Sequence, residues 1–234
     1  MSFTGKAVVV TGGAGALGRA VVRALIDAGA QVHVPLFERE LRPGHPLEGE
    51  PQVTFHSGVD LADEAAVERF YVAVDDTLGG HGLWASIHIA GGFAMAGIEQ
   101  TSLAEWQRMM AMNGTSCFLC CREAVKRMSE GGRIVNVGAG PALNPVGGMA
   151  AYSASKAVVV NLTQSLAREL ADRSIWVNAV VPSIMNTPAN RAGMPDADHS
   201  RWATVEDVAQ TVSFLASPDN RVSSGALVPV SGRA

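Results

Sequence analysis

Tyr152 and Lys156 lie four residues apart in the stretch YSASK, and their side chains could transfer a proton. Side chains four positions apart share one face of a helix, so the ammonium of Lys156 would lie beside the phenol of Tyr152. A nearby positive charge favours the phenolate and would lower the pKa of Tyr152 towards neutrality, which makes proton exchange with a carbonyl oxygen feasible. The same lysine could bind a ribose. In isolation the pair could equally be an ordinary tyrosine and lysine on a helix, so its meaning depends on the rest of the chain.

A glycine-rich segment, TGGAGALG, directly follows the first apolar run and opens a helix. Gly13, Gly15 and Gly18 fit the pattern G-x-G-x-x-G, in which missing side chains let the backbone turn tightly and approach a pyrophosphate at a helix N-terminus. The alternative is a tight strand-helix turn with no ligand. The position after the first strand favours a dinucleotide site, formed by Gly12, Gly13, Gly15, Ala16, Leu17 and Gly18.

The second and third strands should supply contacts to the adenosine half of such a dinucleotide. Glu38 lies about 20 residues beyond the glycines, where an acid binds ribose hydroxyls. Arg39 beside it could instead meet a 2′-phosphate, so the cofactor is NAD or NADP, with a slight preference for NAD. Asp60 could accept a hydrogen bond from the adenine amine, or could cap the next helix.

Seven short β-branched runs alternate with helical patterns and must position these residues. Strand-helix alternation predicts one α/β domain over residues 1–234, a doubly wound Rossmann-type fold with a seven-stranded parallel sheet covered on both faces. The Pro- and Gly-rich stretch 42–51 is expected to be a surface loop. The predicted strands are 7–10, 31–34, 52–55, 86–89, 133–137, 175–181 and 226–230.

Composition narrows the possible partners. The chain has 234 residues, of which 17% are charged, and a net charge of −4 without any Lys/Arg block, which argues against nucleic acid and a basic membrane-binding face. No stretch has the roughly 18 apolar residues of a membrane span, and no secretory signal is found. We therefore expect a cytoplasmic protein that binds a small molecule.

Metal ligation is not expected from the cysteines or the histidines. Cys117, Cys120 and Cys121 share one face of a predicted helix and are interpreted as buried, reduced thiols, because a metal site would need further ligands. The remaining histidines considered show no ligand spacing and are expected to be structural or exposed; they are His33, His45, His56 and His81.

Taken together, TGGAGALG, DLAD at 60–63, Asn113, YSASK and PSIMNTP at 182–188 resemble the short-chain dehydrogenase/reductase family along nearly the whole chain. The resemblance implies that Asn113 holds a proton-relay water, that Tyr152 is the acid/base, and that Lys156 binds ribose and tunes Tyr152. It also implies cofactor contacts from Ala90, Gly91, Pro182, Ile184 and Thr187, with the last two at the carboxamide. Together with two predicted long helices, 103–129 and 152–171, it implies a homodimer or homotetramer.

One departure from the family pattern affects the chemistry most. Ala139 lies where the family has a substrate-orienting serine, and losing an oxyanion donor can cost about 10²-fold or more in rate. Other departures are Ala16, His88 and Ser183, each in place of a usual family residue.

The dihydropteridine reductase branch of the family lacks that serine, and this sequence resembles it in several stretches, including Met194 to Asp198. A quinonoid dihydropterin is an imine-type electrophile that accepts hydride without localising charge on an oxygen. Two alternatives stay open: a general ketone, aldehyde or quinone reductase, and a catalytically weak NAD(P)-binding sensor. The expected substrate contacts are Asn144 and, in a short substrate loop near 187–203, Met194 and His199.

That loop has its own folding signals. Trp202 is expected to pack the loop onto the next helix, although it could also contact substrate together with His199. Thr204 and Asp207 resemble a capping box, which would fix the start of that helix.

Overall fold

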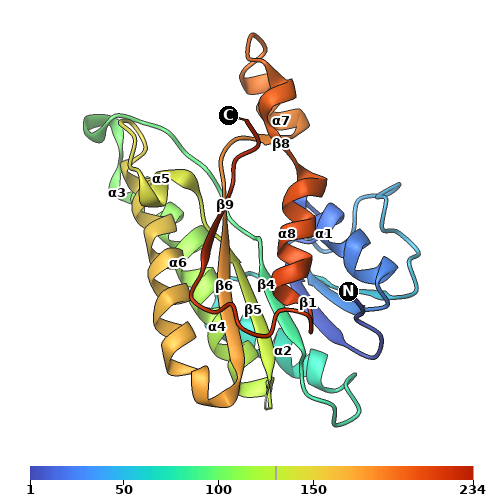
Figure 1. The fold of residues 1–234 in the computed structure, drawn as a ribbon. Coiled ribbons are helices and arrows are strands. Elements are labelled where there is room, and N and C mark those ends of the chain that lie inside the picture. Colours follow the sequence, from blue (N-terminus) through green and yellow to red (C-terminus); the bar gives the residue numbers. More distant parts are fainter. Residues whose placement is uncertain (130, 234) are drawn as a thin grey trace.

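Seven parallel strands form the centre of the computed structural model, which describes residues 1–129 and 131–233 (Figure 1). The predicted doubly wound α/β fold and its seven-stranded sheet are confirmed. The order of the sheet reverses between β1 and β4, which places a crevice at the carboxyl ends of these strands, where α/β folds bind nucleotides. In sheet order the strands are β3 (Val53–His56), β2 (Gln31–Pro35), β1 (Ala7–Thr11), β4 (Ala85–His88), β5 (Gly132–Val137), β6 (Ile175–Pro182) and β9 (Leu227–Val230).

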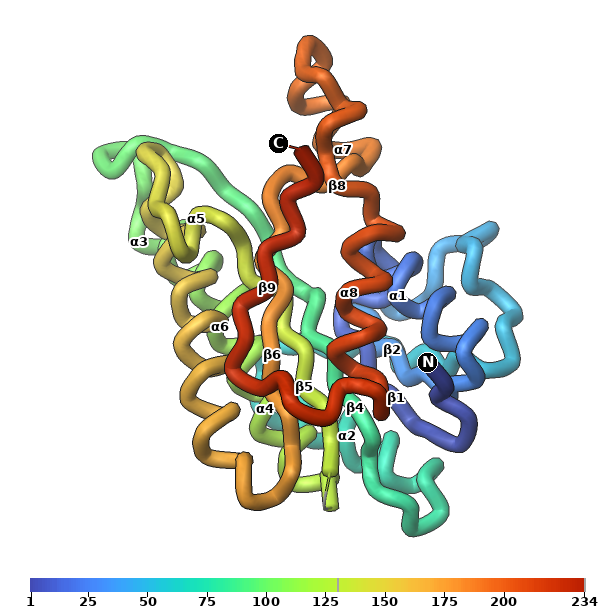
Figure 2. Tube along the Cα trace, in the orientation of Figure 1, coloured from blue at the N-terminus to red at the C-terminus, as the bar shows by residue number. Residues whose placement is uncertain are grey.

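Helices cover both faces of the sheet and bury a separate apolar cluster on each. On one face, α1 (Ala16–Asp27) packs against α8 (Val205–Ala216), and Figure 2 shows the two helices side by side. On the other face lie α2 (Glu64–Asp75), α4 (Ser116–Arg127) and α6 (Ala150–Glu169). Strands buried on both faces are rich in apolar residues, although the buried positions of β4 and β5 also include Ser86, His88 and Asn136.

Two helix starts test the capping predictions. The side chain of Thr204 accepts a hydrogen bond from the backbone N–H of Asp207, and Asp207 accepts one from the backbone N–H of Thr204, so the predicted capping box is confirmed. Asp60 does not cap α2. Asp63 caps it, by accepting a hydrogen bond of 2.8 Å from the N–H of Ala66, because it directly precedes the first helical residue.

The long helix predicted over 103–129 is interrupted. The structure has α3 (Leu103–Met109), a π-helical turn η2 (Met110–Thr115) and then α4. The buried residues of this wider turn are Asn113 and Gly114. Such turns often occur at functional sites, and this one contains Asn113.

Several short elements project from the carboxyl end of the sheet (Figure 1). The loop predicted at 42–51 has neither helix nor strand. None of the described helices combines the length and the apolar character that a membrane crossing needs. The short elements of the structure are η1 (Ile98–Gln100), α5 (Gly140–Leu143), η3 (Ala171–Arg173), α7 (Pro188–Gly193), η4 (His199–Arg201) and the paired strands β7 (Met185–Asn186) and β8 (Ala203–Thr204).

Candidate active site

The glycines after β1 are required for three different reasons. Gly12 has a φ of +66°, and a Cβ there would lie 2.8 Å from the backbone nitrogen of Ala90. A Cβ on Gly13 would lie 2.8 Å from the methyl groups of Val34, so this glycine lets the loop pack onto β2. A Cβ on Gly18 would collide with the carbonyl oxygen of Gly12, so this glycine lets α1 begin close to the loop. The result is a backbone cradle at the start of α1 that suits a pyrophosphate.

This cradle borders a cavity of about 960 Å³. Gly12, Gly15, Ala16, Leu17 and Gly18 line one side of it. The other lining residues include residues from the ends of β2 and β4, the 42–51 loop, the loop after β3, and η2. The size and the glycine cradle fit a dinucleotide.

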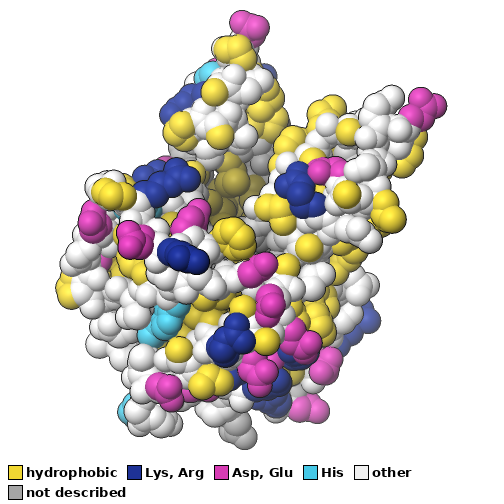
Figure 3. All heavy atoms as spheres, turned by 180° about the vertical axis from the view of Figure 1, so that it is seen from behind, with side chains coloured by type: hydrophobic (Ala, Val, Ile, Leu, Met, Phe, Trp, Pro, Cys, Tyr) yellow, Lys and Arg dark blue, Asp and Glu magenta, His cyan; other side chains and the backbone are white. Residues whose placement is uncertain are grey.

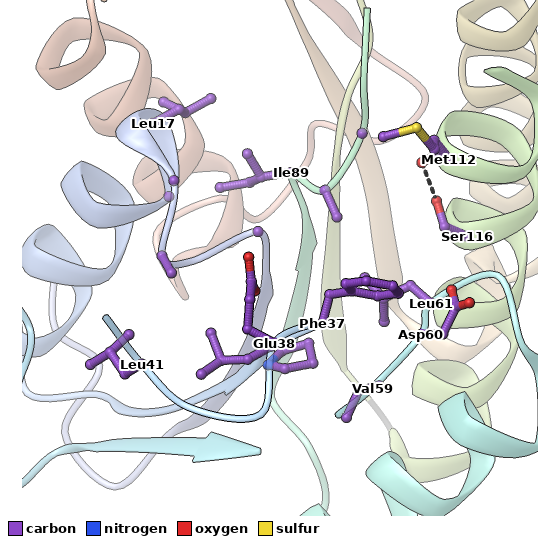
Figure 4. A pocket seen from close by; sticks show the side chains of 18 of the residues that line it. Leu17, Phe37, Glu38, Leu41, Val59, Asp60, Leu61, Ile89, Met112 and Ser116 are labelled. Atoms are coloured by element: carbon purple, nitrogen blue, oxygen red, sulfur yellow. Dashed lines mark hydrogen bonds between the residues drawn. The ribbon is translucent and has the colours of Figure 1, made fainter. Parts of the chain in front are cut away.

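The adenosine side of the cavity contains both acids that the sequence singled out. Figure 4 shows the carboxylate of Glu38 directed into the cavity, with Asp60 across from it. Asp60 Oδ1 accepts a hydrogen bond of 2.9 Å from the N–H of Ala62, which fixes the loop after β3. Arg19 and Arg42 also line the cavity, whereas Arg39 is not among its lining residues.

Sequence reasoning missed His45 as a lining residue of the cavity. Its Nε2 lies 3.1 Å from the carbonyl oxygen of Ala14, so it ties the 42–51 loop to the glycine loop. The two residues are 31 positions apart, and no local pattern relates them.

Asn113 joins the end of β4 to α6. Its Oδ1 accepts a hydrogen bond from the N–H of Gly92, and its Nδ2 donates to the carbonyl of Gly92 and to the hydroxyl of Ser155, each at 3.0 Å. Gly91 lines the cavity, and a Cβ there would collide with Asn113 and lie 3.3 Å from Lys156 Nζ. Gly91 therefore lies between the cavity and the side chains of Asn113 and Lys156. The predicted role of Asn113 in holding a water stays a prediction.

Tyr152 and Lys156 both lie on α6, as predicted, but their electrostatics differ from the prediction. Lys156 Nζ donates a hydrogen bond of 2.9 Å to the carbonyl of Val137, and burial lowers the pKa of Lys156 to about 8. Burial raises the pKa of Tyr152 above its ordinary value. The expected lowering of the Tyr152 pKa is therefore wrong for this structure, because burial desolvates the phenol and penalises the phenolate. The phenol is protonated at neutral pH and can donate a proton.

Ala139 is buried, immediately after β5 and two residues beyond the carbonyl that holds Lys156. Its side chain offers no hydrogen-bond donor. The position that the family fills with a serine hydroxyl is thus apolar here.

The remaining predicted site residues lie at the ends of β5 and β6. Pro182 ends β6, and Ile184 is partly exposed just beyond it. Thr187 caps α7 by accepting a hydrogen bond of 3.2 Å from the N–H of Asn190, so a contact to a carboxamide would have to share that oxygen. Asn144 is exposed at the end of α5.

Met194 and His199 belong to the projecting loop after α7. His199 Nε2 lies 2.7 Å from the carbonyl oxygen of Met194, and its ring lies 4.5 Å from the ring of Trp202. Trp202 is buried, as the packing interpretation predicted. His199 therefore holds the loop together, and its contact with substrate stays a prediction.

Tertiary folding brings together a buried polar group that residue spacing did not reveal. The donor atoms of His88, Cys117 and Cys121 lie within 4.8 Å of one another. His88 Nδ1 is 2.8 Å from Asn136 Oδ1 and 3.4 Å from the sulfur of Cys121, and its Nε2 is 2.8 Å from the hydroxyl of Ser86. These hydrogen bonds connect β4, β5 and α4 beneath the site. All three cysteines are free and buried, as expected.

Known proteins share this fold. The model of the short chain dehydrogenase family matches residues 6–198. The chain is 30% identical to the 3-oxoacyl-acyl-carrier-protein reductase MabA of Mycobacterium tuberculosis, across 98% of this chain and 93% of that protein. It is 35% identical to galactitol 2-dehydrogenase of Rhizobium johnstonii, across 97% of this chain and 93% of that protein.

A solved structure of a short chain dehydrogenase from Burkholderia cenocepacia in complex with NADP is 30% identical and has a TM-score of 0.88, across 99% of this chain and 98% of that one. The chain therefore belongs to the short-chain dehydrogenase/reductase family. It is an NAD(P)-dependent oxidoreductase of that family.

Proposed function

We propose that this enzyme reduces a small conjugated carbonyl or imine compound, with Tyr152 as the proton donor. The observation that carries the proposal is the site at the carboxyl end of β5, where a protonated Tyr152 lies on α6 while Ala139 supplies no hydroxyl. A bound nicotinamide would supply the hydride. Gly91 lines the cavity and adjoins Lys156, so the cofactor cavity and the proton donor are parts of one site.

The side chain at position 139 bears on the substrate. Reduction of an isolated ketone builds charge on one oxygen, which a hydroxyl donor at this position would stabilise. A conjugated electrophile spreads that charge over several atoms and depends less on such a donor. Quinones, diketones and quinonoid dihydropterins are electrophiles of this kind, and the pterin reading rests on this argument together with the sequence resemblance.

We also infer that NADH binds more tightly than NADPH. Glu38 lines the cavity, and its carboxylate would accept hydrogen bonds from ribose hydroxyls and repel a 2′-phosphate. Arg19 and Arg42 also line the cavity, and NADPH would bind more tightly than NADH if either of them bound the 2′-phosphate. The Burkholderia cenocepacia structure is in complex with NADP, so the affinities for NADH and NADPH should both be measured.

An oxidation assay with both cofactors tests the proposal. NADH and NADPH would each be combined with a quinone, an aromatic diketone, an isolated ketone and quinonoid dihydropterin, and oxidation would be followed by absorbance. We expect the conjugated compounds to be reduced and the isolated ketone to react more slowly. Tight cofactor binding without oxidation of any substrate would favour the sensor alternative.

Cofactor preference is measured separately, by titrating nicotinamide fluorescence. Glu38→Gln should improve NADPH binding, because it removes the negative charge that would face the 2′-phosphate. Glu206→Gln, on α8 and outside the cavity lining, is the matched control. A wild-type preference for NADPH would contradict the inference and would point to Arg19 or Arg42.

A further inference from the structure

Exposed apolar side chains gather at the carboxyl end of the sheet, on the side of Tyr152. They come from four separate segments, which follow β4, β5, β6 and α7. Figure 3 shows a hollow between the projecting α7 and the projecting end that carries α3 and α5, with hydrophobic side chains around it. The large apolar side chains in these segments, each at least 36% exposed, are Phe93, Met95, Ile98, Leu143, Val146, Ile184 and Met194.

The segments that surround Tyr152 carry no charge. Residues 89–98 and residues 138–152 contain no Asp, Glu, Lys, Arg or His. In the loop after β6, Arg191 donates to Asn186 Oδ1 at 2.8 Å, and Asp198 accepts from the hydroxyl of Ser200 at 2.6 Å. A charged substrate group that packs against residues 89–98 and 138–152 would therefore lose hydration without gaining an ionic partner from these two segments.

Two of these segments hold each other in place. The N–H of Ala96 donates a hydrogen bond of 2.8 Å to the carbonyl of Gly148. A Cβ on Gly148 would lie 3.2 Å from Cε of Met95, so this side chain lies over the neighbouring loop. The apolar walls are thus fixed to one another.

Phe93 stands directly beside the proton donor. Its ring centroid lies 5.0 Å from that of Tyr152, with the ring planes at 76°, and 58% of the residue is exposed. An aromatic ring left this exposed, in contact with the reacting phenol, presents a surface on which a planar ligand can pack.

We propose that the substrate is a neutral, apolar compound whose ring packs on Phe93 while its reacting atom faces Tyr152. This inference rests on the proposed function and narrows its substrate class. Phe93 is then a specificity-determining residue. Polar sugars and charged acyl carriers should bind poorly to these apolar segments. An apolar quinone or aryl diketone should bind to them better than a pterin.

A matched pair of substrates tests the charge dependence. 1-Phenylpropane-1,2-dione and its ring 4-carboxylate have the same reacting diketone and differ only in one charged group. We expect the carboxylate to lower kcat/KM by about 10²-fold or more, since burying an unpaired charge costs several kcal/mol. Equal kcat/KM for the two compounds would overturn the proposal.

Variants of Phe93 test the packing. Phe93→Ala should raise the KM for the phenyl diketone about tenfold, because it removes an aromatic contact. The KM for 2,3-butanedione, which has no ring, should change by no more than about twofold. Phe93→Tyr should keep the wild-type KM. Phe214→Ala removes a similarly exposed ring from α8 and is the control. An unchanged KM in Phe93→Ala would also overturn the proposal.

A binding measurement keeps this test separate from catalysis. With NAD⁺ present, calorimetry would compare 4-ethyltoluene with 4-ethylbenzoate, neither of which can be reduced at a carbonyl. Tighter binding of 4-ethyltoluene, lost in Phe93→Ala, supports the inference even if every reduction assay fails, a failure that would count against the proposed function alone. Tighter binding of 4-ethylbenzoate, or no binding of either, would overturn the inference.

Discussion

The proposed function makes Tyr152, on α6, the proton donor of the site. Tyr152→Phe removes the proton but keeps the ring that contacts Phe93. We expect turnover to fall by about 10² to 10⁴, with NADH affinity nearly unchanged. Steady-state kinetics and a fluorescence titration measure the two effects. Unchanged turnover would show that another group supplies the proton.

Position 139 tests how the substrate carries charge in the transition state. Ala139→Ser introduces a hydroxyl at the end of β5, where a donor would act only once charge has formed. An isolated ketone or aldehyde should therefore be reduced faster, whereas a conjugated imine or quinone should change little. The ratio of kcat/KM between the two classes is the measured quantity. An equal gain for both classes would contradict the argument.

Among the elements, the turn from β1 into α1 is the part most sensitive to substitution. Gly18→Ala places a methyl group against Gly12 and 2.6 Å from Cα of Gly13, so α1 must move away from the loop. We expect a loss of stability of about 1–3 kcal/mol and weaker NADH binding, because the N–H groups that face the pyrophosphate shift. Thermal unfolding and NADH titration measure these effects. Gly193→Ala, where a Cβ has open space, is the control and should change neither.

The stability of the whole molecule should change with pH because of a pair of histidines, His33 and His56, near the edge of the sheet. His33 Nδ1 lies 3.2 Å from His56 Nε2, and Thr77 Oγ1 lies 3.4 Å from the other nitrogen of His33. Burial, with His56 nearby, lowers the pKa of His33 to about 4. The unfolded chain therefore binds more protons between pH 6.5 and about 4, and stability should fall as the pH falls through that window.

Melting temperatures measured across this window test the histidine pair. In His33→Gln the melting temperature should decrease less as the pH falls. His81→Gln, which changes an exposed histidine, should show the same decrease as the wild type. An equally steep decrease in His33→Gln would show that other groups cause the acid sensitivity.

Association is the second property of the whole molecule to test. α4 exposes the ring of Phe118, and α6 lies beside α4 on the same face of the sheet. We propose that these helices form an interface between copies of the chain, giving a dimer or a tetramer. Light scattering at micromolar concentration measures the mass. Phe118→Glu should shift the population towards monomer, and a wild-type monomer would contradict the proposal.

The sequence by itself determined the elements and several local contacts. Continuous β-branched runs marked all seven strands, and the spacing of Thr204 and Asp207 marked the start of α8. The spacing of Tyr152 and Lys156 placed both on one helix. These features depend on residues a few positions apart, so backbone geometry alone relates them.

Only the tertiary structure decided where the side chains of the site make contact. Asn113 bonds to Gly92 and to Ser155, which is 42 positions away, because a π-helical turn rotates it towards both. The ammonium of Lys156 bonds to Val137 on β5, and burial raises the pKa of Tyr152. Phe93 meets Tyr152 because two loops from different strands pack together. Such contacts depend on strand order, register and burial, and these are properties of the packed sheet that local sequence patterns do not encode.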